Sequence, residues 1–366
     1  MPSATAPTSY KSHLFQMTQT TPTCLWNDSC DLDELAYSIE HGAVGATCNP
    51  SIALSILKKR LPLWRDRIEA VIREMPTATE DQIGRKVVEE MSAAGAALLK
   101  PIFDAQGGRN GRLSIQTDPR LYRNAEALVE QAVHFSQLAP NLIVKIPATC
   151  AGIAAMEKAT YRGVSINATV SFTLPQAIAV AEAVERGLAR REKEGLENRS
   201  MGPVCTIMVG RLDDWMKVLI EKDNLCIDPG YCEWAGVAVF KKAYRIYRER
   251  GYRLRLLSAA FRNHMHWSEF IGGDVVISPP YSWQVRYNAG DVEAVPRMDN
   301  PVDPKVVQQL CAKFPDFARA YSENGISLED FDTFGSTRRT LRQFLAAGDE
   351  LTTIIRDLMI PNPDKK

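Results

Sequence analysis

The nine residues NLIVKIPAT, 141–149, place one lysine inside an apolar run. Such a run, with Leu142–Val144 before Lys145 and Ile146 after it, is typical of a buried strand in a parallel sheet. Taking an ammonium out of water is costly, so a lysine here needs an explanation. A desolvated lysine has a lowered pKa, and its neutral amine can form a Schiff base with a carbonyl. Alternatively, Lys145 lies at the strand end and its ammonium reaches the rim or a carboxylate.

Short apolar runs recur along the chain and alternate with segments of helical periodicity. The predicted strands are 24–28, 44–48, 113–117, 142–146, 164–169, 204–209, 254–259 and 275–278, and the clearest helical patterns are 32–40, 80–103, 124–137, 174–194 and 232–250. Eight strands, each followed by a helix, predict an α/β fold of the (β/α)8 TIM barrel type. The runner-up is an open doubly wound sheet, which usually has a glycine-rich turn after its first strand. The sequence LWNDSC has no glycine there.

The chain divides into three predicted parts. Residues 1–20 are expected to form a flexible N-terminal tail, and residues 21–296 the barrel. The segment DVEAVPRMDNPVDP, 291–304, is rich in proline and aspartate and indicates the exit from the barrel. Residues 297–366 are predicted to form a C-terminal helical extension packed on the barrel. Within it, TRRTLRQFL (337–345) favours an amphipathic surface helix over one that places an arginine above the barrel mouth.

Composition excludes several classes of protein. Lys+Arg and Asp+Glu both number 44, so the net charge of zero gives no global reason to bind nucleic acid or an acidic membrane. We expect no membrane span, because no run of about 18 apolar residues occurs. The eight cysteines contain no C-x-x-C pair, which indicates reduced thiols and a cytoplasmic location. His264 and His266 form an H-x-H pair without a nearby third ligand, so we expect no metal, and no cofactor.

Polar residues gather where the predicted strands end, which is the end of a TIM barrel that carries the active site. The set comprises Asp28, Thr47, Asn49, Ser51, Gln116, Asp118, Lys145, Thr149, Asn167, Thr169, Thr206, Arg211, Arg262 and Asn263. Around a buried lysine, these groups suit a Schiff-base amine, a carboxylate that transfers protons, amides and hydroxyls for a polyol, and two arginines for a phosphate.

These motifs resemble the transaldolase family. The resemblance runs through GATCNPS (45–51), GRLSIQTDPRL (111–121), NLIVKIPAT (141–149), SINATVSF (165–172), MVGRLDDW (208–215) and AFRN (260–263). It covers the barrel from about residue 24 to 280. It implies that Lys145 is the Schiff-base nucleophile, that Asp28 is the acid/base and that Thr169 helps to hold a catalytic water.

The same resemblance implies the substrate contacts. Asn49 and Asn167 would bind the hydroxyls of the donor, and Arg211 and Arg262 the sugar phosphate. The remaining expected substrate ligands are Thr47, Ser51 and Thr206.

Four positions depart from the family pattern. Gln116 stands where transaldolases have a glutamate that moves protons through a water, and an amide holds such a water but takes no proton from it. The related fructose-6-phosphate aldolases carry glutamine there, together with a strand-six tyrosine whose place is taken here by Met208. Ala260 and Thr206 replace two serines of the family.

Three functions therefore stay open. The first is a transaldolase of the pentose phosphate pathway, which moves a dihydroxyacetone unit from fructose 6-phosphate or sedoheptulose 7-phosphate to an aldose phosphate. The second is a lyase like the fructose-6-phosphate aldolases, or a variant in specialised metabolism. The third is a catalytically weak barrel that binds sugar phosphates. The sequence leaves the oligomeric state, monomer or dimer, open.

Overall fold

The computed structural model describes residues 10–364 and shows a closed barrel of eight parallel strands. Each strand pairs with its neighbour along the chain, and β8 pairs with β1 to close the ring. The strands are β1 (Cys24–Asn27), β2 (Ala43–Thr47), β3 (Arg112–Gln116), β4 (Leu142–Pro147), β5 (Ile166–Thr169), β6 (Val204–Ile207), β7 (Arg255–Ser258) and β8 (Val276–Ile277). The TIM barrel predicted from the alternating pattern is confirmed.

Helices follow the strands and surround the barrel. They are α2 (Leu32–Glu40), α3 (Pro50–Glu74), α4 (Glu80–Ala105), α5 (Ala125–Ser136), α6 (Cys150–Tyr161), α7 (Leu174–Lys193), α8 (Val209–Lys222), α9 (Ala235–Arg250), α10 (Met265–Ser268) and α11 (Tyr281–Ala289). Local sequence fixes several helix starts. For example, the Thr79 hydroxyl and the Gln82 side chain form a reciprocal capping box at the first turn of α4.

The N-terminal segment differs from its prediction. Helix α1 (His13–Thr20) buries Leu14 and Met17 completely, and the Trp267 indole N–H donates to the Met17 sulfur over 3.3 Å. The expectation of a flexible tail is therefore wrong for residues 13–20, because two apolar side chains three positions apart give this short helix a face to bury. Residues 1–9 of the predicted tail lie outside the described residues.

The barrel interior is filled by apolar side chains below the predicted site. Trp26 and Ile143 lie in this layer, whose other members are Val204, Leu257, Ala259 and Val276. Gly45 makes room for the indole, because a Cβ at that position would lie 2.4 Å from Trp26 Cε2. The barrel is thus packed with apolar side chains at this level, and the polar set that surrounds Lys145 lies above it, toward the carboxyl ends of the strands.

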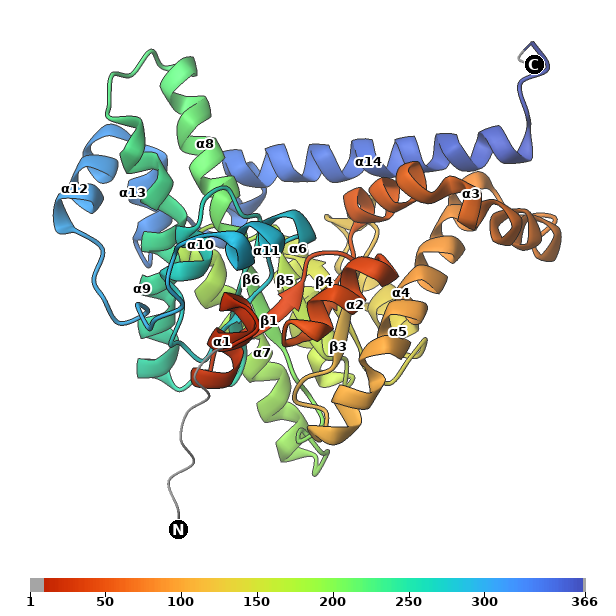
Figure 1. Cartoon of the computed structure of the whole chain (residues 1–366), viewed down its shortest axis with the longest axis horizontal. Coiled ribbons are helices and arrows are strands. Elements are labelled where there is room, and N and C mark those ends of the chain that lie inside the picture. Colours follow the sequence, from red (N-terminus) through yellow and green to blue (C-terminus); the bar gives the residue numbers. More distant parts are fainter. Residues whose placement is uncertain (1–9, 365–366) are drawn as a thin grey trace.

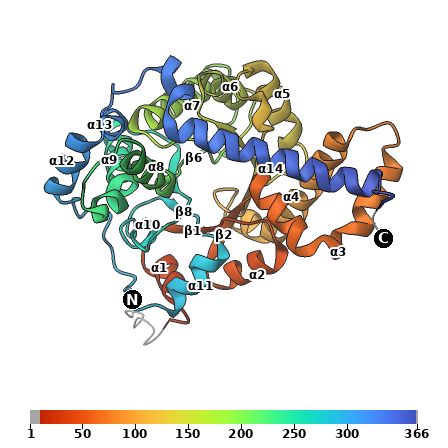
Figure 2. The same cartoon turned by 90° about the horizontal axis from the view of Figure 1, so that it is seen from above.

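The C-terminal part is helical and returns to the barrel. It comprises α12 (Pro304–Lys313), α13 (Pro315–Tyr321), the 3-10 helix η3 (Leu328–Thr333) and α14 (Gly335–Met359). Helix α14 crosses the carboxyl end of the barrel from α8 to α3 and α4 (Figures 1 and 2). Thr340, Leu341 and Phe344 are among its buried residues. The interpretation of 337–345 as a plain surface helix was therefore incomplete, since the helix covers part of the barrel mouth.

Two findings bear on the expectations from composition. All eight cysteines are free thiols, as their spacing predicted. Within residues 10–364, no helix combines the length and the apolar character that crossing a membrane requires.

Candidate active site

Lys145 lies near the carboxyl end of β4 and is 1 % exposed. Burial lowers the pKa of its ammonium from the ordinary value. The Asp28 carboxylate acts in the opposite direction and raises this pKa, whereas the Arg211 guanidinium lowers it further. The interpretation of Lys145 as a buried lysine is confirmed, and its use as a nucleophile stays a prediction.

Asp28 follows β1 directly and is half-buried. The Thr47 hydroxyl, at the end of β2, donates to Asp28 Oδ1 over 2.5 Å. The Asp28 backbone N–H donates to the Pro279 carbonyl at 3.3 Å, which ties the residue to the segment after β8. Because both of these partners belong to strand ends, the carboxylate is held at the barrel mouth rather than free to turn to solvent.

A chain of three buried side chains crosses the interior beside Lys145. The Thr206 hydroxyl donates to Asn167 Oδ1 at 2.7 Å, and Asn167 Nδ2 donates to the Ser114 hydroxyl at 3.0 Å. All three side chains are fully buried. Ser114 was missed in the sequence, although it lies two residues before Gln116 and therefore shares its face of β3. The chain fixes the amide of Asn167 and hence the orientation it would present to a substrate.

Gln116 and Asn49 lie on the side of the barrel formed by β2 and β3. Gln116 is opposite Lys145 in the register of β3 and β4, and its buried Oε1 has no hydrogen-bond partner. Asn49 Oδ1 accepts from the Ile52 backbone N–H at 3.0 Å and caps α3, which leaves its amide N–H groups to donate. Ser51 is half-buried in the first turn of this helix.

Thr169 and Met208 meet at the ends of β5 and β6. Thr169 is fully buried, and its hydroxyl donates a weak hydrogen bond to the Met208 sulfur over 3.8 Å. The next residue, Val170, has φ +52°, and Ala260 after β7 has φ +65°. A left-handed backbone is costly for a residue other than glycine, and most of all for a β-branched one. The packing around the strand ends therefore imposes these two turns.

The two predicted phosphate arginines lie close together at the ends of β6 and β7. Arg211, in the first turn of α8, donates to Gln343 Oε1 and approaches the Thr340 hydroxyl at 3.5 Å, both on α14. Burial, and then the nearby Arg262 guanidinium, lower the pKa of Arg211 to about 10. The exposed Arg262 forms bonds of 2.8 to 3.1 Å with the Asp214 carboxylate.

A buried histidine–aspartate pair supports the Arg262 segment and was not found from the sequence. His266 Nε2 is 2.8 Å from Asp213 Oδ2, and His266 Nδ1 accepts from the Arg262 backbone N–H at 3.0 Å. Both side chains of the pair are completely buried. Each ring nitrogen of His266 thus has a protein partner, and His264 Nδ1 contacts the Ser268 hydroxyl at 3.0 Å. The H-x-H motif serves packing and hydrogen bonding here.

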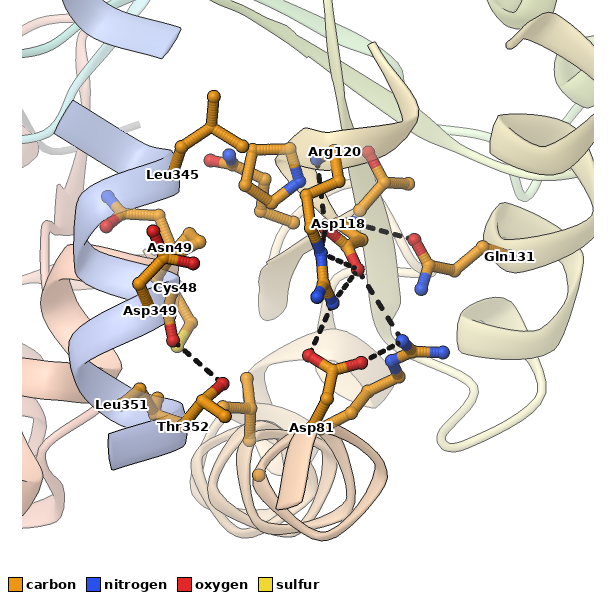
Figure 3. A pocket seen from close by; sticks show the side chains of 18 of the residues that line it. Cys48, Asn49, Asp81, Asp118, Arg120, Gln131, Leu345, Asp349, Leu351 and Thr352 are labelled. Carbon is orange, nitrogen blue, oxygen red and sulfur yellow. Dashed lines mark hydrogen bonds and ion pairs between the residues drawn. The ribbon is translucent and has the colours of Figure 1, made fainter. Parts of the chain in front are cut away.

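A cavity opens beside Gln116, between the ends of β2 and β3, the first turns of α4 and the second half of α14 (Figure 3). Its polar lining includes Asn49, Gln116, Asp118, Arg120 and Asp349. Arg120 Nε donates to both carboxylate oxygens of Asp118, at 3.0 and 3.1 Å. The cavity therefore has fixed ionic walls on one side and the helix as its cover.

The protein is thus a TIM barrel whose carboxyl end holds a buried lysine surrounded by hydroxyls, amides and arginines. The sequence from residue 25 to 333 matches the family described as Transaldolase/Fructose-6-phosphate aldolase, and the chain belongs to this family. The resemblance inferred from the motifs is confirmed.

Similar curated proteins are named transaldolases. The chain is 32 % identical over 218 residues to "Transaldolase 1" of Streptomyces avermitilis, which covers 59 % of this chain and 57 % of that protein. It is 31 % identical over 233 residues to "Transaldolase" of Thiobacillus denitrificans, covering 62 % and 64 % of the two chains. A "Transaldolase" of Mycobacterium ulcerans is 31 % identical over 210 residues, covering 56 % and 55 %. The chain thus matches between about half and two thirds of the length of these relatives.

Proposed function

We propose that this protein is a transaldolase that transfers a dihydroxyacetone unit from a ketose phosphate to an aldose phosphate through a Schiff base on Lys145. The observation that carries the proposal is the burial of Lys145, which lowers the pKa of its ammonium beside a carboxylate. A lowered pKa increases the fraction of neutral amine, which is the form that attacks a carbonyl carbon.

In the proposed reaction, the Lys145 amine attacks the ketose carbonyl and the resulting carbinolamine loses water to give an iminium ion. Asp28, oriented by Thr47, takes the proton of the hydroxyl on the carbon that will leave, and the adjacent carbon–carbon bond breaks. The electron pair stays on the lysine-bound three-carbon unit as an enamine, which then adds to the acceptor aldehyde. Water hydrolyses the new iminium ion and regenerates the amine.

The other side chains have proposed binding roles. Asn167, Thr206 and Asn49 would meet the hydroxyls of the donor, and Arg211 and Arg262 its phosphate. Thr169 and Gln116 would hold the water that is expelled and later consumed, and Ser51 would contact substrate from the start of α3. Fructose 6-phosphate and sedoheptulose 7-phosphate are the proposed donors, which places the reaction in the pentose phosphate pathway. The eight free thiols agree with a cytoplasmic location.

Trapping of the intermediate tests the proposal. The protein is incubated with fructose 6-phosphate and sodium borohydride, and its peptides are mapped by mass spectrometry. A three-carbon adduct on the peptide with Lys145, absent from Lys145→Ala, is the expected result. If wild type carries no adduct, the Schiff-base proposal fails and the weak sugar-phosphate-binding barrel becomes the better account.

A second candidate is an aldolase that releases the three-carbon unit. Gln116 favours it, because fructose-6-phosphate aldolases resemble this chain at that position, whereas Met208 and the C-terminal helices favour the transferase. The two are separated by incubating the enzyme with fructose 6-phosphate alone or together with erythrose 4-phosphate. A transferase needs the acceptor for turnover, and an aldolase releases free dihydroxyacetone without it.

A further inference from the structure

The cavity of Figure 3 contains a buried polar atom for which the fold supplies no partner. Gln116 is 8 % exposed, and its Oε1 has no hydrogen-bond partner among the described residues. Gln116 also lines the cavity, so the side chain that carries this enclosed acceptor borders a space that a ligand can enter. An unpaired buried acceptor is unfavourable, and a hydroxyl that donates to it would remove this penalty.

The position of the cavity relative to the arginines fixes which end of a substrate would enter it. In the closed order β1 to β8, strands β2 and β3 stand across the barrel from β6 and β7. Asn49 and Gln116 are at the ends of the first pair, and Arg211 and Arg262 follow the second. Lys145, on β4, lies between the two sides. A ketose with its phosphate at the arginines and its carbonyl at Lys145 therefore directs its other end toward Gln116.

The charges of the lining select the chemistry of that end. Asp81, Asp118 and Asp349 line the cavity together with Arg85 and Arg120. Both arginines form ion pairs with carboxylates: Arg85 Nη2 is 2.9 Å from Asp81 Oδ2, and Arg120 pairs with Asp118. The cavity thus has three carboxylates and two arginines that are already paired, so a second phosphate or a carboxylate of a ligand would be repelled. Uncharged hydroxyl groups suit the cavity.

We propose that this cavity is a second subsite of the active site, which accepts an uncharged, hydroxylated carbon chain on the side of the ketone carbonyl opposite the phosphate. The enzyme would then retain on Lys145 not only dihydroxyacetone but also longer hydroxyketone units. The proposal rests on the proposed function, because it needs the carbonyl at Lys145. Hydroxyketones longer than dihydroxyacetone are then a further class of donor for this enzyme.

One glycine allows the subsite to be filled without damage to the fold. Gly348 lies on α14 and lines the cavity, and a Cβ at this position meets no atom within 4 Å. Gly84 lines the same cavity but offers no such room, since its Cβ would lie 2.6 Å from Leu351 Cδ2. Gly348→Leu and Gly348→Phe therefore extend side chains into the empty space. Gly348→Ala is the matched control, because it adds only a methyl group and improves helix propensity.

The test compares two nucleophiles with glyceraldehyde 3-phosphate as acceptor. Dihydroxyacetone gives a six-carbon ketose phosphate, and erythrulose adds as a whole to give a seven-carbon one. In the second reaction the iminium ion of erythrulose on Lys145 loses a proton to Asp28 from the hydroxymethyl carbon next to the former carbonyl. This carbon becomes the enamine carbon and bonds to the aldehyde carbon. The new alkoxide takes a proton, and water releases the product from Lys145. Reaction at that carbon leaves the dihydroxyethyl end of erythrulose at Gln116, and the product mass separates the two reactions.

Wild type and Gly348→Ala are expected to form both products. Gly348→Phe should lower kcat/KM for erythrulose at least tenfold and for dihydroxyacetone less than twofold, with Gly348→Leu between them. Thermal melting of each variant reports that the fold is kept.

The proposed subsite is overturned if wild type makes the six-carbon product but no seven-carbon product, or if Gly348→Phe affects both nucleophiles equally. Failure of the proposed function looks different: neither product forms and no borohydride adduct appears on Lys145, in which case both proposals are withdrawn.

Discussion

The two sides of the barrel mouth share one helical cover but differ in charge. On the arginine side, Arg211 meets only neutral groups of α14, Thr340 and Gln343, while Arg262 is paired with Asp214. On the cavity side, both arginines are paired with carboxylates and the buried Gln116 Oε1 has no partner. Among the described residues at the barrel mouth, only the arginine side holds an arginine without a carboxylate partner. An anion is therefore expected there, and a hydroxyl on the other side.

The lysine between the two sides is expected to give the largest effect. Lys145→Ala should lower turnover on the order of 10⁴-fold or more, because it removes the nucleophile. Lys145→Arg should be equally inactive, since a guanidinium stays protonated. Steady-state transfer from fructose 6-phosphate to erythrose 4-phosphate measures this, with circular dichroism as the control for folding. Activity of either variant above background would rule out the Schiff base.

Gln116→Glu replaces the neutral amide on the cavity side by a carboxylate and is expected to change the rate of the reaction. A carboxylate beside the reacting water can take its proton, and general base catalysis typically contributes a factor of about 10². We expect the variant to be the faster transferase, measured as kcat with fructose 6-phosphate. A slower enzyme with a displaced pH optimum would mean that the pocket is tuned around the amide. A rate and pH profile equal to wild type would remove Gln116 from the chemistry.

The two arginines should differ from each other. Loss of a charge-assisted contact to phosphate costs about 1.5–3 kcal/mol, or roughly ten- to a hundredfold in KM. Arg211→Ala should lie at the upper end, because Arg211 is half-buried and has no carboxylate partner, and Arg262→Ala at the lower end, because Arg262 is exposed and paired with Asp214. Dihydroxyacetone, which has no phosphate, serves as the control nucleophile and should be little affected. Equal losses with phosphorylated and unphosphorylated substrates would show that the arginines are structural.

The smallest effect on KM is expected from substitutions in α14, the helix that covers the barrel mouth. Gln343→Ala removes the α14 side chain that receives the Arg211 hydrogen bond, so we expect KM for the phosphorylated donor to change by about two- to fivefold, as for one modest hydrogen bond. Arg342→Ala, at the neighbouring exposed position, is the matched control. If the two variants have the same KM, then α14 does not position Arg211.

Much of the fold was readable from the sequence because each strand of a parallel barrel is a short apolar run. All eight predicted strands occur, with ends that differ by at most two residues, and α2 begins and ends at the residues its periodicity indicated. The strand ends also located the polar set, since strand direction places these ends on one face. Lys145 stood out because a charge interrupts an apolar run.

What escaped the sequence depends on contacts between distant segments. The Arg211–Gln343 contact joins residues 132 positions apart, and the Asp213–His266 pair joins residues 53 apart. Neither has a local pattern that distinguishes it from ordinary surface or core residues. The course of α14 over the mouth was also hidden, because an amphipathic pattern shows that a helix has a buried face but not what covers it. The first helix was missed since only two of its side chains are buried.

The pH dependence of trapping at Lys145 tests directly whether its buried amine is the nucleophile. The protein is mixed with dihydroxyacetone at increasing pH and quenched with borohydride, and the rate of adduct formation on the Lys145 peptide is measured. Because burial lowers the pKa of Lys145, the rate should reach half of its plateau below about pH 10.4, the value for a free lysine side chain. Asp28→Asn should move this midpoint lower still, because the carboxylate raises the Lys145 pKa. A midpoint at or above that of a free lysine, or one that rises in Asp28→Asn, would contradict the account.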